Sequence, residues 1–178
     1  METVVLGGGC FWCTHAVFTL VRGVLAVESG YANGKGPQPT YEQVCQGDTG
    51  YAEVVRVQFD PAQVRLEALL EVFMAAHDPT QRNRQGHDVG TQYRSGIYCT
   101  SAAQEAQVRA WVQALQAQWP AGAPIVTEVE PLHNFWLAED YHQDYFERQP
   151  HQRYCALVVQ PKLAHVQALC APHLRATG

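Results

Sequence analysis

Tyr51-Ala52-Glu53-Val54-Val55-Arg56-Val57-Gln58-Phe59 is the clearest strand in the sequence. Apolar side chains largely alternate along it, so Glu53 shares a face with Val55 and Val57. Asp60-Pro61 then ends the strand. Glu53 could still be a solvent-facing strand residue, but its position favours the apolar face. We therefore expect burial to raise the pKa of Glu53, so that the carboxyl stays protonated near neutral pH.

Strand-like and helical patterns alternate on both sides of this segment. Short β-branched runs predict strands over 3–6, 24–27, 51–59, 95–99, 124–130 and 154–159. Amphipathic spacing predicts helices over 10–21, 64–76, 101–118, 138–147 and 163–169. The loops at 30–50 and 77–94 are long enough to be functional. This order favours an α+β fold with a mixed or antiparallel sheet, and specifically a ferredoxin-like two-layer core with long functional loops.

Length and composition indicate one globular domain over residues 1–178. The chain is 47% hydrophobic and 16% charged, which suffices for a core and is too apolar for disorder. Its 12 basic and 17 acidic residues give a formal charge of −5, which disfavours nucleic acid and anionic membranes as partners. Apolar runs are short, and the N-terminus lacks a signal-peptide pattern. We expect a cytoplasmic monomer.

Six cysteines occur, too few and too scattered for a disulfide scaffold in a chain of this length. Gly7-Gly8-Gly9-Cys10 places one thiol where a strand gives way to a helix. The free amides and positive dipole end of the helix favour an anion there, so we expect a lowered pKa at Cys10. Phe11 and Trp12 follow directly. They can pack in the core, or form an apolar pocket for a methyl or thioether group beside a reactive sulfur.

The same residues allow other interpretations. A phosphate-binding loop would require Gly-Lys-Ser/Thr, which Gly9-Cys10-Phe11 does not provide. A zinc site could recruit Cys10, Cys13 and His15, but the sequence offers no second metal-binding pair to complete it. Cys10 and Cys13 also have the spacing of a dithiol redox motif, and that interpretation stays open.

At these residues the sequence resembles the A-type peptide methionine sulfoxide reductases, whose signature is Gly-Cys-Phe-Trp. Residues 9–12 carry that signature, and similar blocks follow in order over nearly the whole chain. These blocks are Gly30-Tyr31-Ala32, Pro39–Cys45, Thr49–Val55, His77–Thr80, Gln85–Ser95 and Ala138–Gln143.

The resemblance implies reduction of the S-epimer of methionine sulfoxide, in proteins and as the free amino acid, as a repair of oxidative damage. It implies that Cys10 is the nucleophile and Glu53 the acid, while Phe11 and Trp12 bind the S-methyl group. Other implied site residues are Tyr41 and Tyr93, which bind and orient the sulfoxide oxygen, and Asp88, which contacts the substrate's backbone amide or supports its neighbours.

The resemblance also implies how the enzyme is recycled. Attack leaves Cys10 as a sulfenic acid, and a second thiol condenses with it to a disulfide that thioredoxin reopens, without a bound cofactor or metal. Cys155 is the implied second thiol, on a mobile C-terminal tail. Cys13 is the alternative because it is close in sequence, and Cys170 is a possible shuttle. Two further thiols, Cys45 and Cys99, are expected to be buried and structural.

Three positions depart from the family's pattern. His15 stands where the family usually has glutamate, Tyr51 where it usually has histidine, and Asn33 replaces a frequent glycine. The remaining histidines, His77 among them, are expected in loops and on the surface, with His142 the one best placed for a structural hydrogen bond.

Other functions remain to be separated from the reductase. One is a thiol–disulfide oxidoreductase that uses Cys10 and Cys13. Another is a non-catalytic module that binds methionine-containing peptides through Phe11 and Trp12. A Cys-His hydrolase ranks lower, because no histidine has an argued position beside Cys10.

Overall fold

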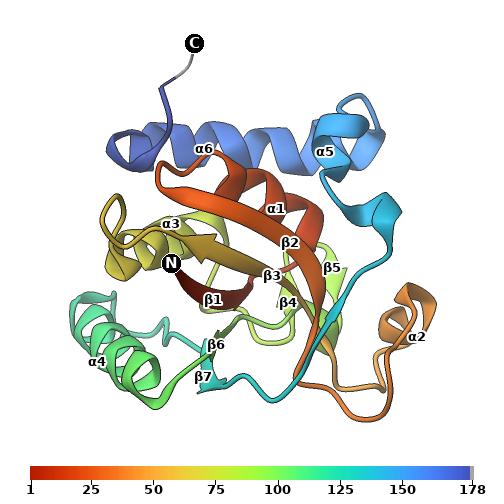
Figure 1. Cartoon of the computed structure of the whole chain (residues 1–178), viewed down its shortest axis with the longest axis horizontal. Helices are drawn as coiled ribbons and strands as arrows, with labels where there is room; N and C mark the ends of the chain where they lie inside the picture. The colour runs from red at the N-terminus through yellow and green to blue at the C-terminus, as the bar shows by residue number, and fades with distance from the viewer. Residues whose placement is uncertain (177–178) are drawn as a thin grey trace.

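Strands and helices alternate along the computed structural model, which describes residues 1–176 (Figure 1). The strands are β1 (Glu2–Gly7), β2 (Val24–Ala32), β3 (Ala52–Phe59), β4 (Arg84–Gln85), β5 (Asp88–Val89), β6 (Gly96–Cys99), β7 (Glu128–Pro131) and β8 (Phe135–Leu137). The α-helices are α1 (Phe11–Thr19), α2 (Tyr41–Cys45), α3 (Leu66–Ala76), α4 (Ala102–Gln118), α5 (Tyr145–Arg148) and α6 (Gln160–Cys170). Single 3₁₀ turns cover Thr91–Tyr93, Asp140–His142 and Ala171–His173, and a π-helical turn covers Cys155–Val159.

The main sheet has the strand order β7-β6-β1-β3-β2-β8 within the described residues. β3 lies between β1 and β2 and is antiparallel to both, and β6 is antiparallel to β1. These strands, with α1 and α3, follow the β-α-β-β-α-β order of a ferredoxin-like core. β8 adds an antiparallel edge and β7 a parallel one. The predicted α+β fold with a mixed sheet is therefore confirmed.

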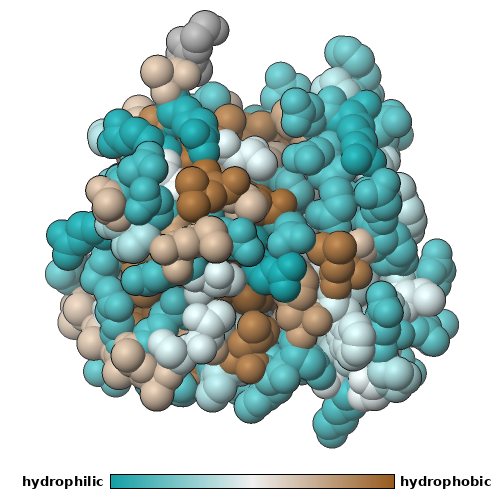
Figure 2. Space-filling view, in the orientation of Figure 1, coloured by the Kyte–Doolittle hydropathy of each residue, from teal (hydrophilic) through white to brown (hydrophobic). Residues whose placement is uncertain are grey.

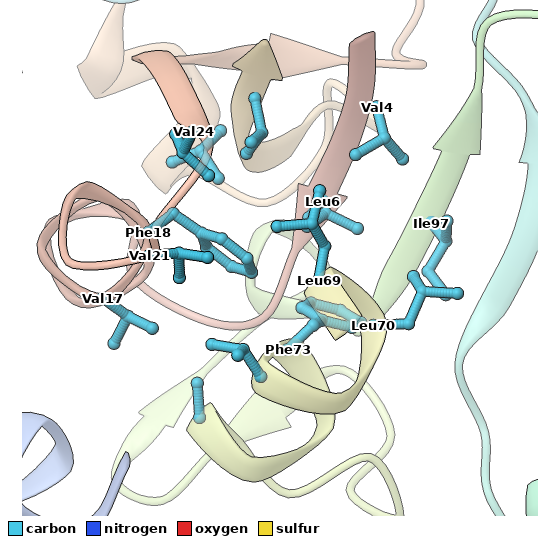
Figure 3. Packing of buried hydrophobic residues seen from close by; sticks show 14 of the residues in the cluster. Val4, Leu6, Val17, Phe18, Val21, Val24, Leu69, Leu70, Phe73 and Ile97 are labelled. Carbon is cyan, nitrogen blue, oxygen red and sulfur yellow. The ribbon is translucent and has the colours of Figure 1, made fainter. Parts of the chain in front are cut away.

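The hydrophobic core fills the space between one sheet face and the helices. Figure 3 shows Leu6 on β1, Phe18 on α1 and Phe73 on α3 directed toward one another, and all are fully buried. Alternation along β3 sends Val55 and Val57 into the same cluster, as the sequence predicts. Because Glu53 has the same parity, its carboxyl lies on this face too.

The C-terminal helix covers the helical layer. In Figure 1, α6 crosses next to α1, and it also contacts α3. α4 packs beside β6 and β7 at the far edge of the sheet. The last described turn is joined to the end of α1 by a bridge between Val21 and Leu174. Residues distant in the sequence thus meet around α1, the helix that begins just after Cys10.

Several predicted elements differ from the structure. Residues 154–159 are helical rather than a strand, because buried Cys155, Val159 and Val166 recur at near-helical spacing and pack inward. The predicted helix over 138–147 is broken at Asp144, whose φ is 53°. The loop at 30–50 contains α2, which begins at a capping box between Thr40 and Gln43, and its first residues continue β2. The strand placed at 124–130 forms as β7, over Glu128–Pro131.

The surface in Figure 2 is mainly hydrophilic, with separate apolar patches, and is strongly hydrophilic over α5. Within residues 1–176, no helix has the length and apolar character needed to cross a bilayer.

Candidate active site

A glycine turn brings the end of β1 to the start of α1 and places Cys10 there. Gly9 has φ +95°, a backbone conformation that side chains disfavour. Gly8 packs so closely that an added Cβ would lie 3.0 Å from the Phe73 ring and 3.1 Å from His77. The turn therefore requires small residues. Cys10 follows as the N-cap of α1 and is only 9% exposed.

Glu53 lies against the first turn of α1. The backbone N–H of Phe11 donates to Glu53 Oε1 at 3.2 Å, and Oε2 has no hydrogen-bond partner within the described residues. The residue is 1% exposed. Burial raises the pKa of Glu53 to about 8, although the Phe11 hydrogen bond opposes the shift. The carboxyl is therefore protonated near neutrality, as its place on the apolar face of β3 predicts.

The sequence prediction for the Cys10 thiol is wrong. Burial, followed by the charge of Glu53, raises the pKa of Cys10 well above its usual range, and the Trp12 backbone N–H only partly opposes this. The helix terminus does favour an anion, but the sulfur has lost its water and faces a carboxyl group. Cys10 and Glu53 thus both retain their protons at neutral pH.

Two tyrosines surround the same carboxyl. Burial, and next the charge of Glu53, raises the pKa of both Tyr41 and Tyr93. The charge of Cys10 also contributes at Tyr93. Both hydroxyls therefore remain protonated donors, and the structure brings them together with Cys10 and Glu53.

The aromatic pair after Cys10 divides between two environments. Phe11 is buried, with its ring 5.7 Å from Tyr31 and 4.9 Å from His142 between centroids. Trp12 is only partly buried, and it stacks on Tyr145 at 3.8 Å with 6° between the planes. Its Nε1 donates to His142 Nδ1 at 3.0 Å, so the hydrogen bond predicted for His142 is confirmed.

Asp88 lies near the thiols but already has a partner. The hydroxyl of Tyr154 donates to Asp88 Oδ2 at 2.5 Å and lies 3.9 Å from Cys13 Sγ. The Tyr154 ring also meets Trp12 edge-on, at 5.7 Å between centroids. Sequence reasoning missed Tyr154, whose only signal was its place directly before Cys155.

Two of the remaining thiols, Cys155 and Cys45, differ in exposure from what the sequence suggests. Cys155 was expected on a mobile tail, but it is fully buried in a cluster with Cys13 and Val159. Cys155 is buried because its π-helical turn continues into α6, and both pack on α1. Cys45 is exposed on α2 rather than buried, while Cys99 is buried as expected.

Glu139 is another residue that sequence reasoning did not single out. Its Oε1 accepts from the Tyr31 hydroxyl at 2.7 Å, and its Oε2 accepts from the Tyr41 backbone N–H at 2.9 Å. This carboxylate fixes the start of α2 beside the Phe11 ring. Its position in a family-like block was the available signal.

Two histidines are less exposed than a surface role would require. His77, expected in a loop or on the surface, is 8% exposed and contacts Phe73 O and Ser95 Oγ. His15 contacts Ser29 and Asp144 through its two ring nitrogens, which leaves neither for zinc. No group of three or more potential metal ligands occurs within residues 1–176.

These contacts group a buried thiol, a buried carboxyl and two tyrosine hydroxyls on the helical face of an α+β fold. The family model for peptide methionine sulfoxide reductase matches residues 2–173. The chain belongs to the peptide methionine sulfoxide reductase family and is an oxidoreductase.

Individual relatives agree with this assignment. The chain is 52% identical to peptide methionine sulfoxide reductase MsrA of Ralstonia nicotianae, over 99% of this chain and 94% of the relative. Its structure is similar to methionine sulfoxide reductase A of Corynebacterium diphtheriae, with a TM-score of 0.80 and 39% identity over 84% of this chain and 75% of that one. It is also similar to yeast Mxr1 in a complex with Trx2, with a TM-score of 0.55 and 26% identity over 81% and 84% of the two chains. The comparisons do not favour the dithiol oxidoreductase or the peptide-binding module.

Proposed function

We propose that this protein reduces the S-epimer of methionine sulfoxide to methionine, both in proteins and as the free amino acid, and so repairs oxidative damage. The observation that carries the proposal is the Glu53 carboxyl, protonated by burial and hydrogen-bonded to the amide that follows Cys10. Sulfoxide reduction needs a nucleophilic sulfur and a proton donor for the departing oxygen. This pair supplies both.

In the first step the Cys10 sulfur attacks the sulfoxide sulfur, and Glu53 protonates the oxygen. The attack forms a bond between the Cys10 sulfur and the substrate sulfur. This bond and the sulfur–oxygen bond of the substrate then break, the oxygen passes to the Cys10 sulfur as the hydroxyl of a sulfenic acid, and methionine is released. Cys10 is oxidised by two electrons and the substrate is reduced by two. The Cys10 thiol gives up its proton in this step, and Glu53 regains one, either that proton directly or another from the solvent.

The neighbouring residues bind the substrate. The hydroxyls of Tyr41 and Tyr93 are protonated donors for the sulfoxide oxygen, and their grouping around Glu53 supports this role. Phe11 and Trp12 form the apolar wall for the S-methyl group. Asp88 accepts from the substrate's backbone amide, in competition with the Tyr154 hydroxyl that occupies it in this structure.

A second thiol then condenses with the sulfenic acid, forming a disulfide and releasing water. We propose Cys155 for this role, with Cys13 as the alternative and Cys170 as a possible shuttle. Cys13 lies one helical turn after Cys10, whose carbonyl accepts its backbone N–H at 3.1 Å, and it shares a buried cluster with Cys155.

Thioredoxin is the proposed external reductant of that disulfide, supported by the complex of Mxr1 with Trx2. We further propose that residues 1–178 act as one catalytic domain, without a bound cofactor, as a cytoplasmic monomer. The family match over residues 2–173 supports the single domain.

The test of the reaction is incubation with racemic N-acetyl-methionine sulfoxide and dithiothreitol, with both epimers resolved on a chiral column. Selective loss of the S-epimer is expected, and Cys10→Ser should abolish it. If neither epimer is consumed, the proposed function is wrong.

The second thiol is tested by Cys13→Ser and Cys155→Ser. The variant that lacks this thiol should release one methionine per chain without external reductant and accumulate sulfenic acid, which dimedone traps on Cys10. Cys99→Ser is the matched control, because Cys99 is buried outside the cluster of Cys13 and Cys155. Trapping in Cys13→Ser alone would assign the role to Cys13 instead.

A further inference from the structure

His15 joins two segments that meet beside Trp12. It lies on α1 and is 3% exposed. Its Nδ1 is 2.9 Å from Ser29 Oγ on β2, and its Nε2 is 3.0 Å from Asp144 Oδ1 just before α5. Asp144 has φ 53°, in the left-handed region that non-glycine residues seldom occupy. Such a conformation persists where surrounding contacts favour it, and the His15 hydrogen bond is one of these contacts.

The chemistry of these partners fixes the form of the His15 ring. A carboxylate only accepts hydrogen bonds, so Nε2 carries the proton and donates to Asp144. In the neutral ring, Nδ1 then accepts from the Ser29 hydroxyl. Burial lowers the pKa of His15, which favours this neutral form. Both ring nitrogens are satisfied, as buried polar groups require.

Ser29 is also the anchor for the segment that precedes α5. Its backbone N–H donates to Gln143 Oε1 at 2.9 Å, and its carbonyl accepts from Gln143 Nε2 at 3.0 Å. His15 extends this attachment by one residue, to Asp144. The next residue, Tyr145, is the one that stacks on Trp12 at 3.8 Å. A continuous set of contacts therefore runs from β2 through His15 to the Trp12 ring.

The Trp12 ring borders empty space on one side. A hollow of about 360 Å³ lies next to it, lined by Trp12, His15, Tyr145 and Leu163 among others. Its lining residues come from α1, from α5 and the residue before it, and from α6. The Trp12 and Tyr145 rings have space on this side into which they can shift if Asp144 is released.

We propose that His15 is a positioning residue for the reductase: through Asp144 it keeps Tyr145 stacked on Trp12 and so fixes the wall that receives the substrate's methyl group. The inference rests on the proposed function, because that function gives Trp12 its role. His15 contacts neither the Cys10 sulfur nor the position of the departing oxygen. Its loss therefore weakens substrate recognition, and the chemical step is unaffected.

Position 15 and position 144 also form a matched pair. A glutamate at position 15 would direct a second carboxylate at Asp144, and like charges repel. His15→Glu should therefore release Asp144 as alanine does. Adding Asp144→Asn should restore the link, because an amide can donate to the new carboxylate.

The test compares His15→Ala, Asp144→Ala and the double variant, with kcat and KM measured on N-acetyl-methionine-S-sulfoxide. Each single variant should raise KM about three- to tenfold, the range of a lost aromatic pair, with kcat within about twofold of wild type. The double variant should be no worse than either single one, because both remove the same link. Asp144→Asn should resemble wild type, since its amide oxygen still accepts from Nε2–H.

Two controls separate positioning from stability. Val166→Ala trims a fully buried side chain on α6, so it should lower the melting temperature while KM stays unchanged. If His15→Ala does not fold, the KM of Asp144→Ala is compared with that of Asp144→Asn. Both substitutions are at a half-exposed side chain, which the fold tolerates more easily than a change at buried His15. An unchanged KM in Asp144→Ala, or a KM that rises equally in Val166→Ala, would overturn the inference. A wild-type protein that reduces neither epimer would overturn the proposed function instead.

Discussion

The backbone N–H of Phe11 donates to Glu53 Oε1 at 3.2 Å, which ties the first turn of α1 to the centre of the sheet. The same contact sets the carboxyl next to the Cys10 thiol. Two groups that would both be anions then share one buried space, so ionisation of either disfavours ionisation of the other. Glu53 accordingly contributes to the raised pKa of Cys10.

Replacing Glu53 by glutamine should separate the chemistry from the fold. Glutamine can still accept from the Phe11 amide but cannot donate an acidic proton to the sulfoxide oxygen. The first-turnover rate should fall about 10²- to 10⁴-fold, the usual contribution of a general acid. Rapid quench of pre-reduced enzyme with methionine quantified by chromatography measures it.

The matching control is alkylation of Cys10 by iodoacetamide. In Glu53→Gln this reaction should become faster at pH 8 to 9, because the charge that raises the pKa of Cys10 is gone. If Glu53→Gln reduces sulfoxide at the wild-type rate, Glu53 is not the acid in the reaction.

The carboxyl itself should titrate with a midpoint near pH 8. The infrared band of the protonated acid should disappear through that range in wild type and in Cys10→Ser, and it should be absent from Glu53→Gln. The first-turnover rate should rise toward pH 8 as the pair loses one proton, and fall at more alkaline pH once both are lost. A band that is lost near pH 4.5 would show an ordinary, hydrated carboxyl instead.

The same shift predicts a pH-dependent stability. The folded state binds the Glu53 proton more tightly than the unfolded state, whose pKa is near 4.5. Stability contributed by this group is therefore complete below pH 4.5 and is lost as pH rises to about 8. Between these limits the unfolding free energy of Glu53→Gln should rise relative to that of wild type by up to about 5 kcal/mol, an upper bound from the shift. Urea unfolding at pH 5 and pH 8.5 measures the difference, and equal differences at both values would contradict it.

Local sequence patterns predicted the features that depend on the periodicity of apolar residues and on the backbone preferences of glycine. The parity of Glu53 with Val55 and Val57 predicted its burial, and the glycines before Cys10 predicted the turn into α1. The family-like blocks drew attention to Tyr41 and Tyr93, and the structure places both near Glu53, a proximity that no local pattern predicts.

What the sequence could not predict depends on contacts between distant segments. At Cys10 the effect of burial on the pKa outweighs that of the helix terminus. The Glu53 carboxyl adds to this effect, and it comes from β3, which is distant in the sequence. Residues 154–159 are a short apolar run that ends in two valines, but they become helical through packing on α1, which buries Cys155. His77 and His15 are buried for the same reason, since Ser95, Ser29 and Asp144 reach them from other elements.

His77 should make the protein sensitive to acid. Its Nδ1 lies 2.6 Å from Phe73 O, to which it donates, so its Nε2 accepts from Ser95 Oγ at 2.7 Å. Burial lowers the pKa of His77 from 6.5 to about 4. The unfolded state therefore binds more protons over that interval, and stability is lost as pH falls from 6.5 toward 4. The loss should reach about 3 kcal/mol for a shift of this size.

His77→Gln can make both hydrogen bonds without titrating, so its unfolding free energy should decline less than that of wild type between pH 6.5 and 4. His87→Gln, at an exposed position, is the matched control and should follow wild type. Parallel declines in wild type and His77→Gln would mean that another group carries the acid sensitivity.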